Sequence, residues 1–105
     1  MRDPNCIFCK IAHKEIPAEF SYEDENFVAF LDIHPVSEGH TLLIPKEHYP
    51  WFYEVPTEIA KNWFATAQTL AKKLNNEYGS HHVEMKIIGI DIAHAHIHLI
   101  PRKLT

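Results

Sequence analysis

The sequence lacks any long hydrophobic run. No stretch of it approaches the roughly 20 consecutive apolar residues that a membrane-spanning helix needs. Its first residues, Met-Arg-Asp-Pro-Asn-Cys, also lack the apolar segment of a secretion signal. These two absences argue against a membrane partner and against export. We therefore expect a cytoplasmic protein.

Positive charge is scarce and scattered. The 105 residues include 10 lysines and arginines against 14 aspartates and glutamates, which gives a formal net charge of -4. Without a cluster of basic residues, the chain has no stripe that could follow a polyphosphate backbone. The composition therefore argues against polymeric nucleic acid as a partner.

Cysteine is rare, and both copies stand close together as Cys6 and Cys9. In a reducing compartment this arrangement indicates metal binding or redox chemistry rather than a structural disulfide. A thioredoxin-like redox motif ordinarily follows a strand, whereas only five residues precede Cys6. Two unliganded core cysteines are a third alternative. The two-residue gap is common in zinc sites, and a closed structural zinc site needs two further ligands.

The chain is long enough, with 46% apolar residues, for one compact domain spanning residues 1–105. Apolar residues that include Trp63 recur at three- and four-residue steps between Thr57, a candidate cap, and Gly79, which predicts a long helix. The other expected elements are a short helix at about residues 6–13 and strands at residues 19–22, 27–32, 40–45, 83–88 and 94–100. Because helices do not separate these strands regularly, we predict an α+β fold with an antiparallel sheet of about five strands and the long helix on one face.

Three histidines alternate with apolar residues in the run His94-Ala95-His96-Ile97-His98-Leu99-Ile100. On a strand the three imidazoles point to one side, and the small and aliphatic side chains between them point to the core. We expect the histidine side to be open to solvent or to line a cleft, because buried imidazoles need hydrogen-bond partners. Neighbouring histidines lie about 7 Å apart at Cα and the outer two about 14 Å, so two can share a metal ion and three cannot.

Two kinds of chemistry fit this pattern. In the first, His96 and His98 hold the metal ion of a metal-dependent hydrolase. In the second, a neutral imidazole attacks a phosphoryl group and carries it as a covalent intermediate. The central His96 is best placed as this nucleophile. His98 and a donor from another strand, for which His40 is the natural candidate, then bind the phosphoryl oxygens.

The histidine run resembles the signature of the histidine-triad (HIT) family of nucleotide hydrolases and transferases, in which three histidines alternate with apolar residues. Four further segments resemble the family in the same order along the chain: Cys6-Ile7-Phe8-Cys9-Lys10-Ile11, Glu15-Ile16-Pro17-Ala18, Ala29-Phe30-Leu31-Asp32-Ile33 and Gly39-His40-Thr41-Leu42-Leu43-Ile44-Pro45-Lys46. The resemblance implies a HIT-like α+β fold and a homodimer joined partly through the long helix.

The resemblance also implies a reaction. His96 would attack the α-phosphorus of a purine nucleoside phosphoramidate or a related phosphoanhydride, and water would then release the nucleoside monophosphate. His98 and His40 would position the phosphate, and Asp32 would accept hydrogen bonds from the ribose hydroxyls. The apolar slot for the purine would consist of Ile7, Phe8 and Ile33. Taken alone, Asp32 is as readily explained as a turn residue ahead of Pro35.

The remaining zinc ligands follow from the same resemblance. Zinc-binding relatives use a histidine just after the Pro-Lys of the third strand and the first histidine of the triad, positions that His48 and His94 occupy here. Together with Cys6 and Cys9 they would hold a structural zinc. A metal at the His94 end leaves His96 free, about 7 Å away.

The chain departs from the family pattern just before the triad. Many members have Gly-Gln-Ser or Gly-Gln-Thr there, whereas this chain has Gly89-Ile90-Asp91-Ile92-Ala93. An ionised Asp91 repels phosphate unless it turns away, so we assign it no binding role. A non-catalytic nucleotide-sensing or partner-binding module is a further hypothesis. The histidines outside the matching motifs are expected on the surface: His13, His34, His81 and His82.

Overall fold

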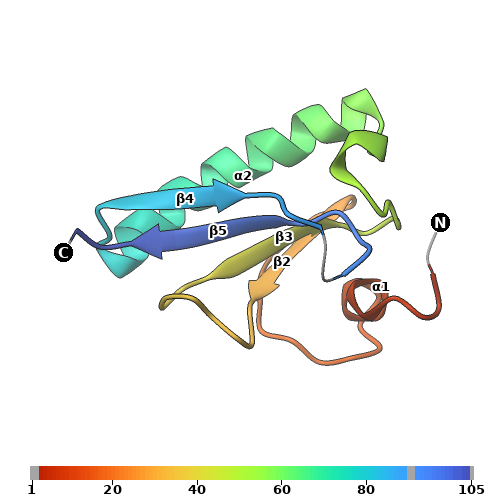
Figure 1. The fold of residues 1–105 in the computed structure, drawn as a ribbon, viewed down its shortest axis with the longest axis horizontal. Coiled ribbons are helices and arrows are strands. Elements are labelled where there is room, and N and C mark those ends of the chain that lie inside the picture. The colour runs from red at the N-terminus through yellow and green to blue at the C-terminus, as the bar shows by residue number, and fades with distance from the viewer. Residues whose placement is uncertain (1–2, 90–91, 105) are drawn as a thin grey trace.

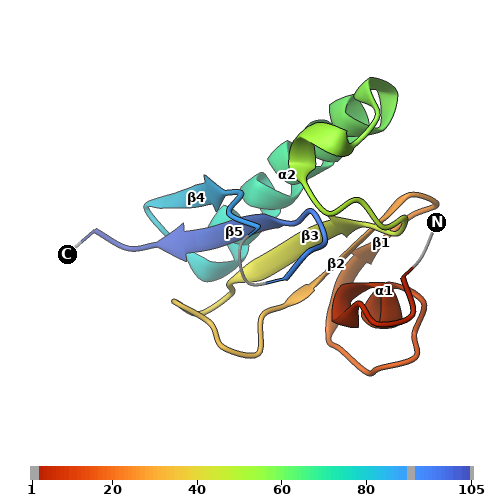
Figure 2. The same ribbon diagram turned by 45° about the vertical axis from the view of Figure 1, so that its right-hand side comes forward.

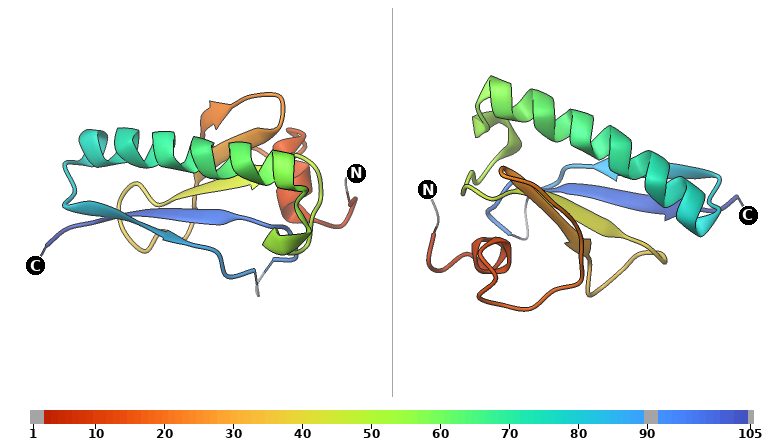
Figure 3. Two further views of the ribbon diagram at one scale, coloured as in Figure 1. Left: turned by 90° about the horizontal axis from the view of Figure 1, so that it is seen from above. Right: turned by 180° about the vertical axis from the view of Figure 1, so that it is seen from behind.

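The computed structural model describes residues 3–89 and 92–104. Its elements are α1 (Ile7–Ala12), β1 (Phe20–Glu23), β2 (Phe27–Leu31), β3 (Thr41–Pro45), the 3₁₀ helix η1 (Phe52–Glu54), α2 (Thr57–Tyr78), β4 (His82–Lys86) and β5 (Ile97–Arg102). All pairings in the five-stranded sheet are antiparallel, in the order β1-β2-β3-β5-β4. The long helix α2 runs along the sheet (Figures 1 and 3). The predicted α+β fold is confirmed.

The two faces of the sheet pack against different helices. On β2, Phe27 and Ala29 belong to the core beneath α2, whereas Val28 and Phe30 pack with residues of α1. Strand β3 repeats this alternation, so both strands are buried along nearly their whole length. Figure 2 shows α1 and α2 well apart, with strands between them. The short helix α1 therefore lies on the face of the sheet opposite α2.

The long helix ends as predicted but begins differently. Gly79 caps its C-terminus in the left-handed conformation, with φ at 56°. Trp63 is fully buried, and its indole N–H donates to the Leu43 carbonyl at 3.2 Å. The prediction that Thr57 caps the helix was wrong, because Pro56 occupies the cap position and no side chain caps the helix. No helix in the described ranges is both long and apolar enough to cross a membrane.

Strand β5 is shifted from the predicted range of residues 94–100. The residues ahead of Ile97 leave the sheet, because the Ala95 amide donates to the Tyr49 carbonyl at 2.6 Å, beyond the end of β3. At its other end the strand continues through Pro101 to Arg102. Only Ile97–Leu99 pair with β3, so the missing N–H of Pro101 costs no hydrogen bond with that strand.

Candidate functional site

Two groups of side chains converge on residues 94–98. In each group the possible ligand atoms lie within 4.8 Å of one another. The first group, called the Cys/His cluster below, consists of Cys6, Cys9, His48 and His94. The second, called the Asp/His cluster, consists of Asp32, His40 and His98. The His96 ring lies beside the second group, with its centroid 4.9 Å from that of His98.

The Cys/His cluster is assembled by α1 and by two segments outside the regular strands. Cys6 is the N-cap of α1, and its Sγ accepts a hydrogen bond from the Cys9 amide at 3.4 Å. Cys9 Sγ lies 3.3 Å from Nδ1 of His48 and 3.4 Å from Nδ1 of His94. Cys6 Sγ lies 3.3 Å from the same His94 nitrogen. The four predicted metal ligands therefore come together in space.

These distances suit a tetrahedral zinc ion. Zinc bonds near 2.3 Å to sulfur and 2.0 Å to nitrogen give sulfur–nitrogen edges of about 3.5 Å. The outer nitrogens of both rings face acceptors: His94 Nε2 donates to the Pro45 carbonyl at 2.8 Å, and His48 Nε2 lies 3.8 Å from Asp3 Oδ2. An acceptor behind the ring keeps the proton on Nε2, which leaves Nδ1 free to ligate. The residues present fit zinc.

Burial shifts the pKa of two members of the Cys/His cluster. It lowers the pKa of His94 to about 4, so this ring is neutral at pH 7, the form that binds a metal. It raises the pKa of the Cys9 thiol to about 11. Cys9 therefore becomes a thiolate at neutral pH only where a cation offsets its burial. A divalent metal ion held by these four residues would supply that cation.

His96 is oriented by the backbone of its own segment. Its Nδ1 lies 2.7 Å from the His94 carbonyl oxygen. Because a carbonyl only accepts, Nδ1 carries the proton, and Nε2 of the neutral ring has a free lone pair. That nitrogen makes no hydrogen bond to a residue of the described ranges. The ring also packs edge-on against Phe8, with centroids 5.1 Å apart.

Two rings of the triad are closed to solvent. We expected the histidine side either to be open to solvent or to line a cleft; His94 is 0% exposed and His96 is 5% exposed, so the first of these alternatives is wrong for these two residues. They lie ahead of the strand, where the cysteines and Phe8 of α1 cover them. His98, within the strand, is partly exposed. The expectation that Ala95, Ile97 and Leu99 face the core is confirmed.

Hydrogen bonds fix the tautomers of His40 and His98. The Val36 amide donates to His40 Nδ1 at 3.1 Å, so the proton of the neutral ring is on Nε2. His40 Nε2 donates to His98 Nδ1 at 2.9 Å, which leaves the His98 proton on Nε2. Burial lowers the pKa of His98 to about 4 and the pKa of His40 below its usual value. Both rings are therefore neutral at pH 7, and the His98 Nε2–H has no acceptor among the residues that the structure describes.

Asp32 and Gly39 hold the loop that carries His40. Asp32 Oδ1 accepts from the His34 amide at 2.9 Å, and its own amide donates to the His40 carbonyl at 2.9 Å. Its other oxygen, Oδ2, lies 3.6 Å from His40 Nε2. Asp32 is thus a turn residue and also faces the site. Gly39 has φ of +89°, and a Cβ there would lie 2.6 Å from the Tyr78 ring of α2.

The three residues predicted for the purine slot differ in exposure. Ile7 is 45% exposed and Ile33 is 84% exposed, so both offer apolar surface near the site. Phe8 is only 5% exposed and packs against Phe30 as well as His96. Its contacts are those of a residue that supports the histidine ring. The purine slot stays a prediction.

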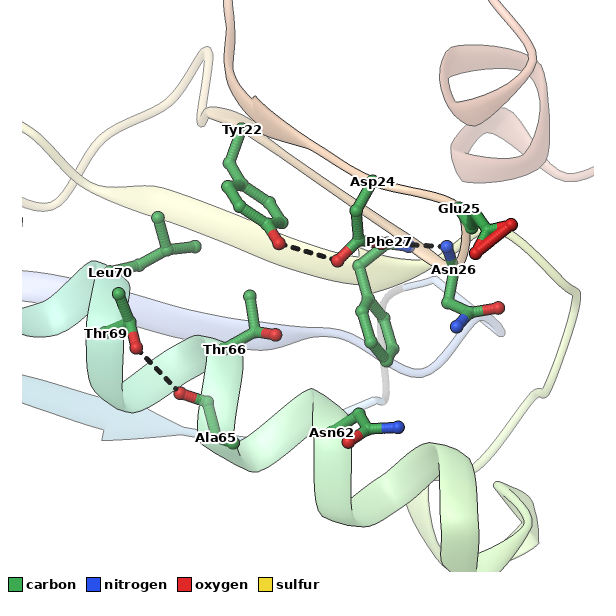
Figure 4. Close-up of a pocket in the computed structure, with 10 residues that line it drawn as sticks. All are labelled: Tyr22, Asp24, Glu25, Asn26, Phe27, Asn62, Ala65, Thr66, Thr69 and Leu70. Atoms are coloured by element: carbon green, nitrogen blue, oxygen red, sulfur yellow. Dashed lines mark hydrogen bonds between the residues drawn. The ribbon is translucent and has the colours of Figure 1, made fainter.

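A cavity of about 400 Å³ lies elsewhere, between the β1–β2 hairpin and α2 (Figure 4). The Tyr22 hydroxyl donates to Asp24 Oδ2 at 2.6 Å, and Asp24 Oδ1 accepts from the amides of Asn26 and Phe27, both at 2.8 Å. These polar groups stabilise the hairpin turn. None of the predicted site residues lines this cavity. Three of those residues, Cys6, Ile7 and His48, line a separate hollow of about 290 Å³ instead.

Three supporting groups were missed by reasoning from the sequence: Asp3, the Val36 amide and the Pro45 carbonyl. Two of them are backbone atoms, which no residue type reveals. Asp3 had a weak signal, a carboxylate three residues before the first cysteine. Asp91 lies outside the described residues. The histidines that we expected on the surface are exposed: His13, His34, His81 and His82.

A family model described as the HIT domain matches residues 13–105. The chain belongs to the HIT family. The resemblance drawn from the sequence motifs is therefore confirmed. This membership agrees with the geometry, because the triad lies where the motif residues of three separate segments meet.

The HIT protein has similar relatives in several kingdoms. It is 43% identical over 101 residues to an uncharacterized HIT-like protein of Methanocaldococcus jannaschii, covering 92% of this chain and 78% of that one. It is 39% identical over 102 residues to the adenosine 5'-monophosphoramidase of Saccharomyces cerevisiae, covering 96% and 65%. A solved structure of a zinc-bound histidine triad family protein from Mycobacterium smegmatis matches with a TM-score of 0.89 at 33% identity, covering 94% and 76%.

Proposed function

We propose that this HIT protein hydrolyses purine nucleoside phosphoramidates or related phosphoanhydrides through a nucleotidyl-histidine intermediate on His96. The observation that carries the proposal is the hydrogen bond of 2.7 Å from His96 Nδ1 to the His94 carbonyl. It holds the proton on one side of the ring and leaves Nε2 as a nucleophile. The name of the yeast relative, adenosine 5'-monophosphoramidase, supports this substrate class.

The reaction has two displacements at phosphorus. His96 Nε2 attacks the α-phosphorus, a P–N bond to the ring forms, and the bond from phosphorus to the leaving group breaks. The leaving group departs with its electron pair and takes up a proton from solvent. A water oxygen then attacks the phosphorus and loses a proton to solvent, the P–N bond to His96 breaks with its electron pair returning to Nε2, and the nucleoside monophosphate is released with the neutral ring restored.

The surrounding residues position the substrate in this proposal. The His98 Nε2–H donates to a non-bridging phosphoryl oxygen, where negative charge grows in the transition state. His40 supports His98 through the hydrogen bond of 2.9 Å. Asp32 Oδ2 accepts from the ribose hydroxyls, and Ile7, Ile33 and the edge of Phe8 contact the base. Each of these roles is a prediction for mutagenesis.

We also propose that Cys6, Cys9, His48 and His94 hold a structural zinc. The short sulfur–nitrogen distances and the acceptors behind both imidazoles support this assignment. A zinc ion there would tie α1 to the segments around β3 and β5. The alternative in which His96 and His98 ligate a catalytic metal has less support. Neither metal-capable group in the described part of the chain includes His96.

A homodimer is the assembly that we propose. Strand β4 is at the edge of the sheet, and Met85 on β4 and Phe64 on α2 are 51% and 39% exposed. They border a hollow of about 400 Å³ lined mainly by apolar side chains. A second copy covering this surface would bury both side chains and the strand edge. Met85→Glu should therefore convert a dimer to a monomer in analytical ultracentrifugation, whereas Leu104→Glu, at another exposed apolar residue, should not.

The catalytic proposal is tested with adenosine 5'-phosphoramidate as substrate. His96→Ala should lower kcat/KM by about 10³-fold or more, because the nucleophile is removed. His81→Ala, at an exposed histidine outside the site, is the matched control and should keep full activity. Undiminished turnover by His96→Ala would refute the mechanism. Binding of AMP with no turnover of any nucleotide derivative by the native protein would favour the non-catalytic sensing module instead.

A further inference from the structure

One backbone group controls the hydrogen bonds of the Asp/His cluster. The Val36 N–H donates to His40 Nδ1 at 3.1 Å, and His40 Nε2 continues to His98 Nδ1 at 2.9 Å. The three groups form a series of hydrogen bonds in which each group donates to the next. The direction of the series is set at the amide, because a backbone N–H can donate a hydrogen bond and cannot accept one.

Without that amide, the hydrogen bond between the His40 and His98 rings could run in either of two directions. In one, His40 Nε2 donates to His98 Nδ1, and the His98 proton is on Nε2. In the other, His98 Nδ1 donates to His40 Nε2, and His98 Nε2 becomes a lone pair that repels a phosphoryl oxygen. Only the first direction leaves an acceptor on His40 Nδ1 for Val36. The amide therefore selects the direction in which His98 is a donor.

The same amide distinguishes this cluster from the Cys/His cluster. A neutral histidine that ligates a metal carries its proton on the other nitrogen and donates it to an acceptor. Behind His94 lies the Pro45 carbonyl, an acceptor at 2.8 Å. Behind His40 lies a donor. If His40 Nε2 bound a metal ion, the proton on Nδ1 would point at the proton of the Val36 amide.

We propose that the Val36 backbone amide is a positioning group, which fixes the His98 proton on Nε2 and keeps metal ions off Asp32, His40 and His98. The ligand atoms of these residues are close enough for an imidazole- and carboxylate-bound transition metal. In the native protein the amide prevents a metal ion from binding there. Its effect on turnover rests on the proposed function, whereas its effects on tautomers and on metal binding do not.

The direct test is the nitrogen NMR spectrum of the imidazoles in the native, zinc-loaded protein. Long-range proton–nitrogen correlations identify which ring nitrogen carries the proton. We expect His40 and His98 both to be protonated on Nε2 at pH 7. Protonation of His40 on Nδ1 would overturn the proposal without any variant having to fold.

The paired variants are Val36→Pro, which removes the N–H, and Val36→Ala, which keeps it. The Val36 side chain is 60% exposed and lies in a loop, so little packing is lost in either case. We expect Val36→Pro to have a mixture of His98 tautomers and about tenfold lower kcat/KM. Val36→Ala should resemble the native protein in both.

The number of metal ions bound per chain is a further test, because it would not change if the Val36 amide had only a structural role. When Co²⁺ is titrated into the zinc-loaded proteins, the native protein and Val36→Ala should hold one metal ion per chain in total, and Val36→Pro a second. Adding Asp32→Asn to Val36→Pro should remove that second equivalent. The proposal is overturned if the native protein binds a second ion that Asp32→Asn abolishes, or if Val36→Pro matches the native tautomers and stoichiometry. Normal tautomers and metal counts in a protein with no turnover would reject the proposed function alone.

Discussion

The Cys/His cluster and the Asp/His cluster lie at opposite ends of the same five-residue segment, and each contains two histidines. The first is closed: Cys9 and His94 are fully buried, and each imidazole has an acceptor behind it. The second is partly open, since Asp32 keeps 19% of its side chain exposed, and its outermost partner is a donor. The groups behind the rings therefore differ: acceptors behind His94 and His48 suit the proposed metal site, and the donor behind His40 suits the proposed substrate site.

A substitution in the closed cluster should reduce the stability of the protein more than any other change considered below. Cys9→Ser should lower the free energy of unfolding by about 3 kcal/mol or more and the melting temperature by about 10 °C or more, because a proposed zinc ligand in the core is lost. Thermal unfolding followed by circular dichroism measures this.

Chelation provides the control for this prediction. Removing zinc from the native protein should reproduce most of the Cys9→Ser loss, and chelation of Cys9→Ser should add little further. A Cys9→Ser protein that retains stoichiometric zinc and the native melting temperature would contradict the assignment of the ligands.

The open cluster should show the reverse behaviour. His98→Asn keeps an acceptor for His40 but lacks the Nε2–H, so we expect kcat/KM to fall by about 10²-fold while stability changes by less than about 1 kcal/mol. Steady-state kinetics with adenosine 5'-phosphoramidate and urea unfolding of the same preparation check both halves. If His98→Asn instead lost much stability and kept normal turnover per folded molecule, the Asp/His cluster would be structural, as we propose for the Cys/His cluster.

A smaller effect concerns acid stability of the metal-free protein. Burial lowers the pKa of His94 and of His98 to about 4 from an ordinary value of 6.5. Between about pH 4 and pH 6.5 the unfolded chain therefore binds more protons than the folded protein does. The free energy of unfolding should consequently fall as the pH decreases from about 6.5 to about 4. His98→Asn should reduce that fall by about 1 kcal/mol, because it removes one of the two titrating rings. The reduction is small because the His98 ring is partly exposed and solvent weakens the effect of its burial.

Urea unfolding at several pH values after chelation measures this slope. His81→Ala, at an exposed histidine, should leave the slope unchanged. An identical slope in His98→Asn and the native protein would mean that the open cluster contributes nothing to the acid sensitivity.

Much of the fold was predictable because it depends on local patterns. The apolar stripe of α2 and the glycine that ends it are visible in the sequence, as is the alternation that sends Ile97 and Leu99 into the core. The burial of His94 and His96 was not predictable from that alternation. It depends on α1, more than 80 residues away in sequence, folding over them.

The site shows the same division. The motif residues identified both clusters, because chemistry restricts which residue types can serve there. The groups that set the tautomers could not be identified from the sequence, because the Pro45 carbonyl and the Val36 amide belong to the backbone. The Pro45 carbonyl contacts the ring of His94, in another segment, and the Val36 amide contacts the ring of His40 across a loop. Their effect follows only from three-dimensional distances.

In the proposed reaction, His96 Nε2 forms a bond to phosphorus. Native protein mixed with adenosine 5'-phosphoramidate and quenched within one turnover should contain an acid-labile AMP adduct, and mass spectrometry of its peptides should place the adduct on His96. We expect this adduct to appear and decay at rates consistent with turnover, and His96→Ala never to form it. Turnover with no adduct, or an adduct on a different residue, would contradict the proposed reaction.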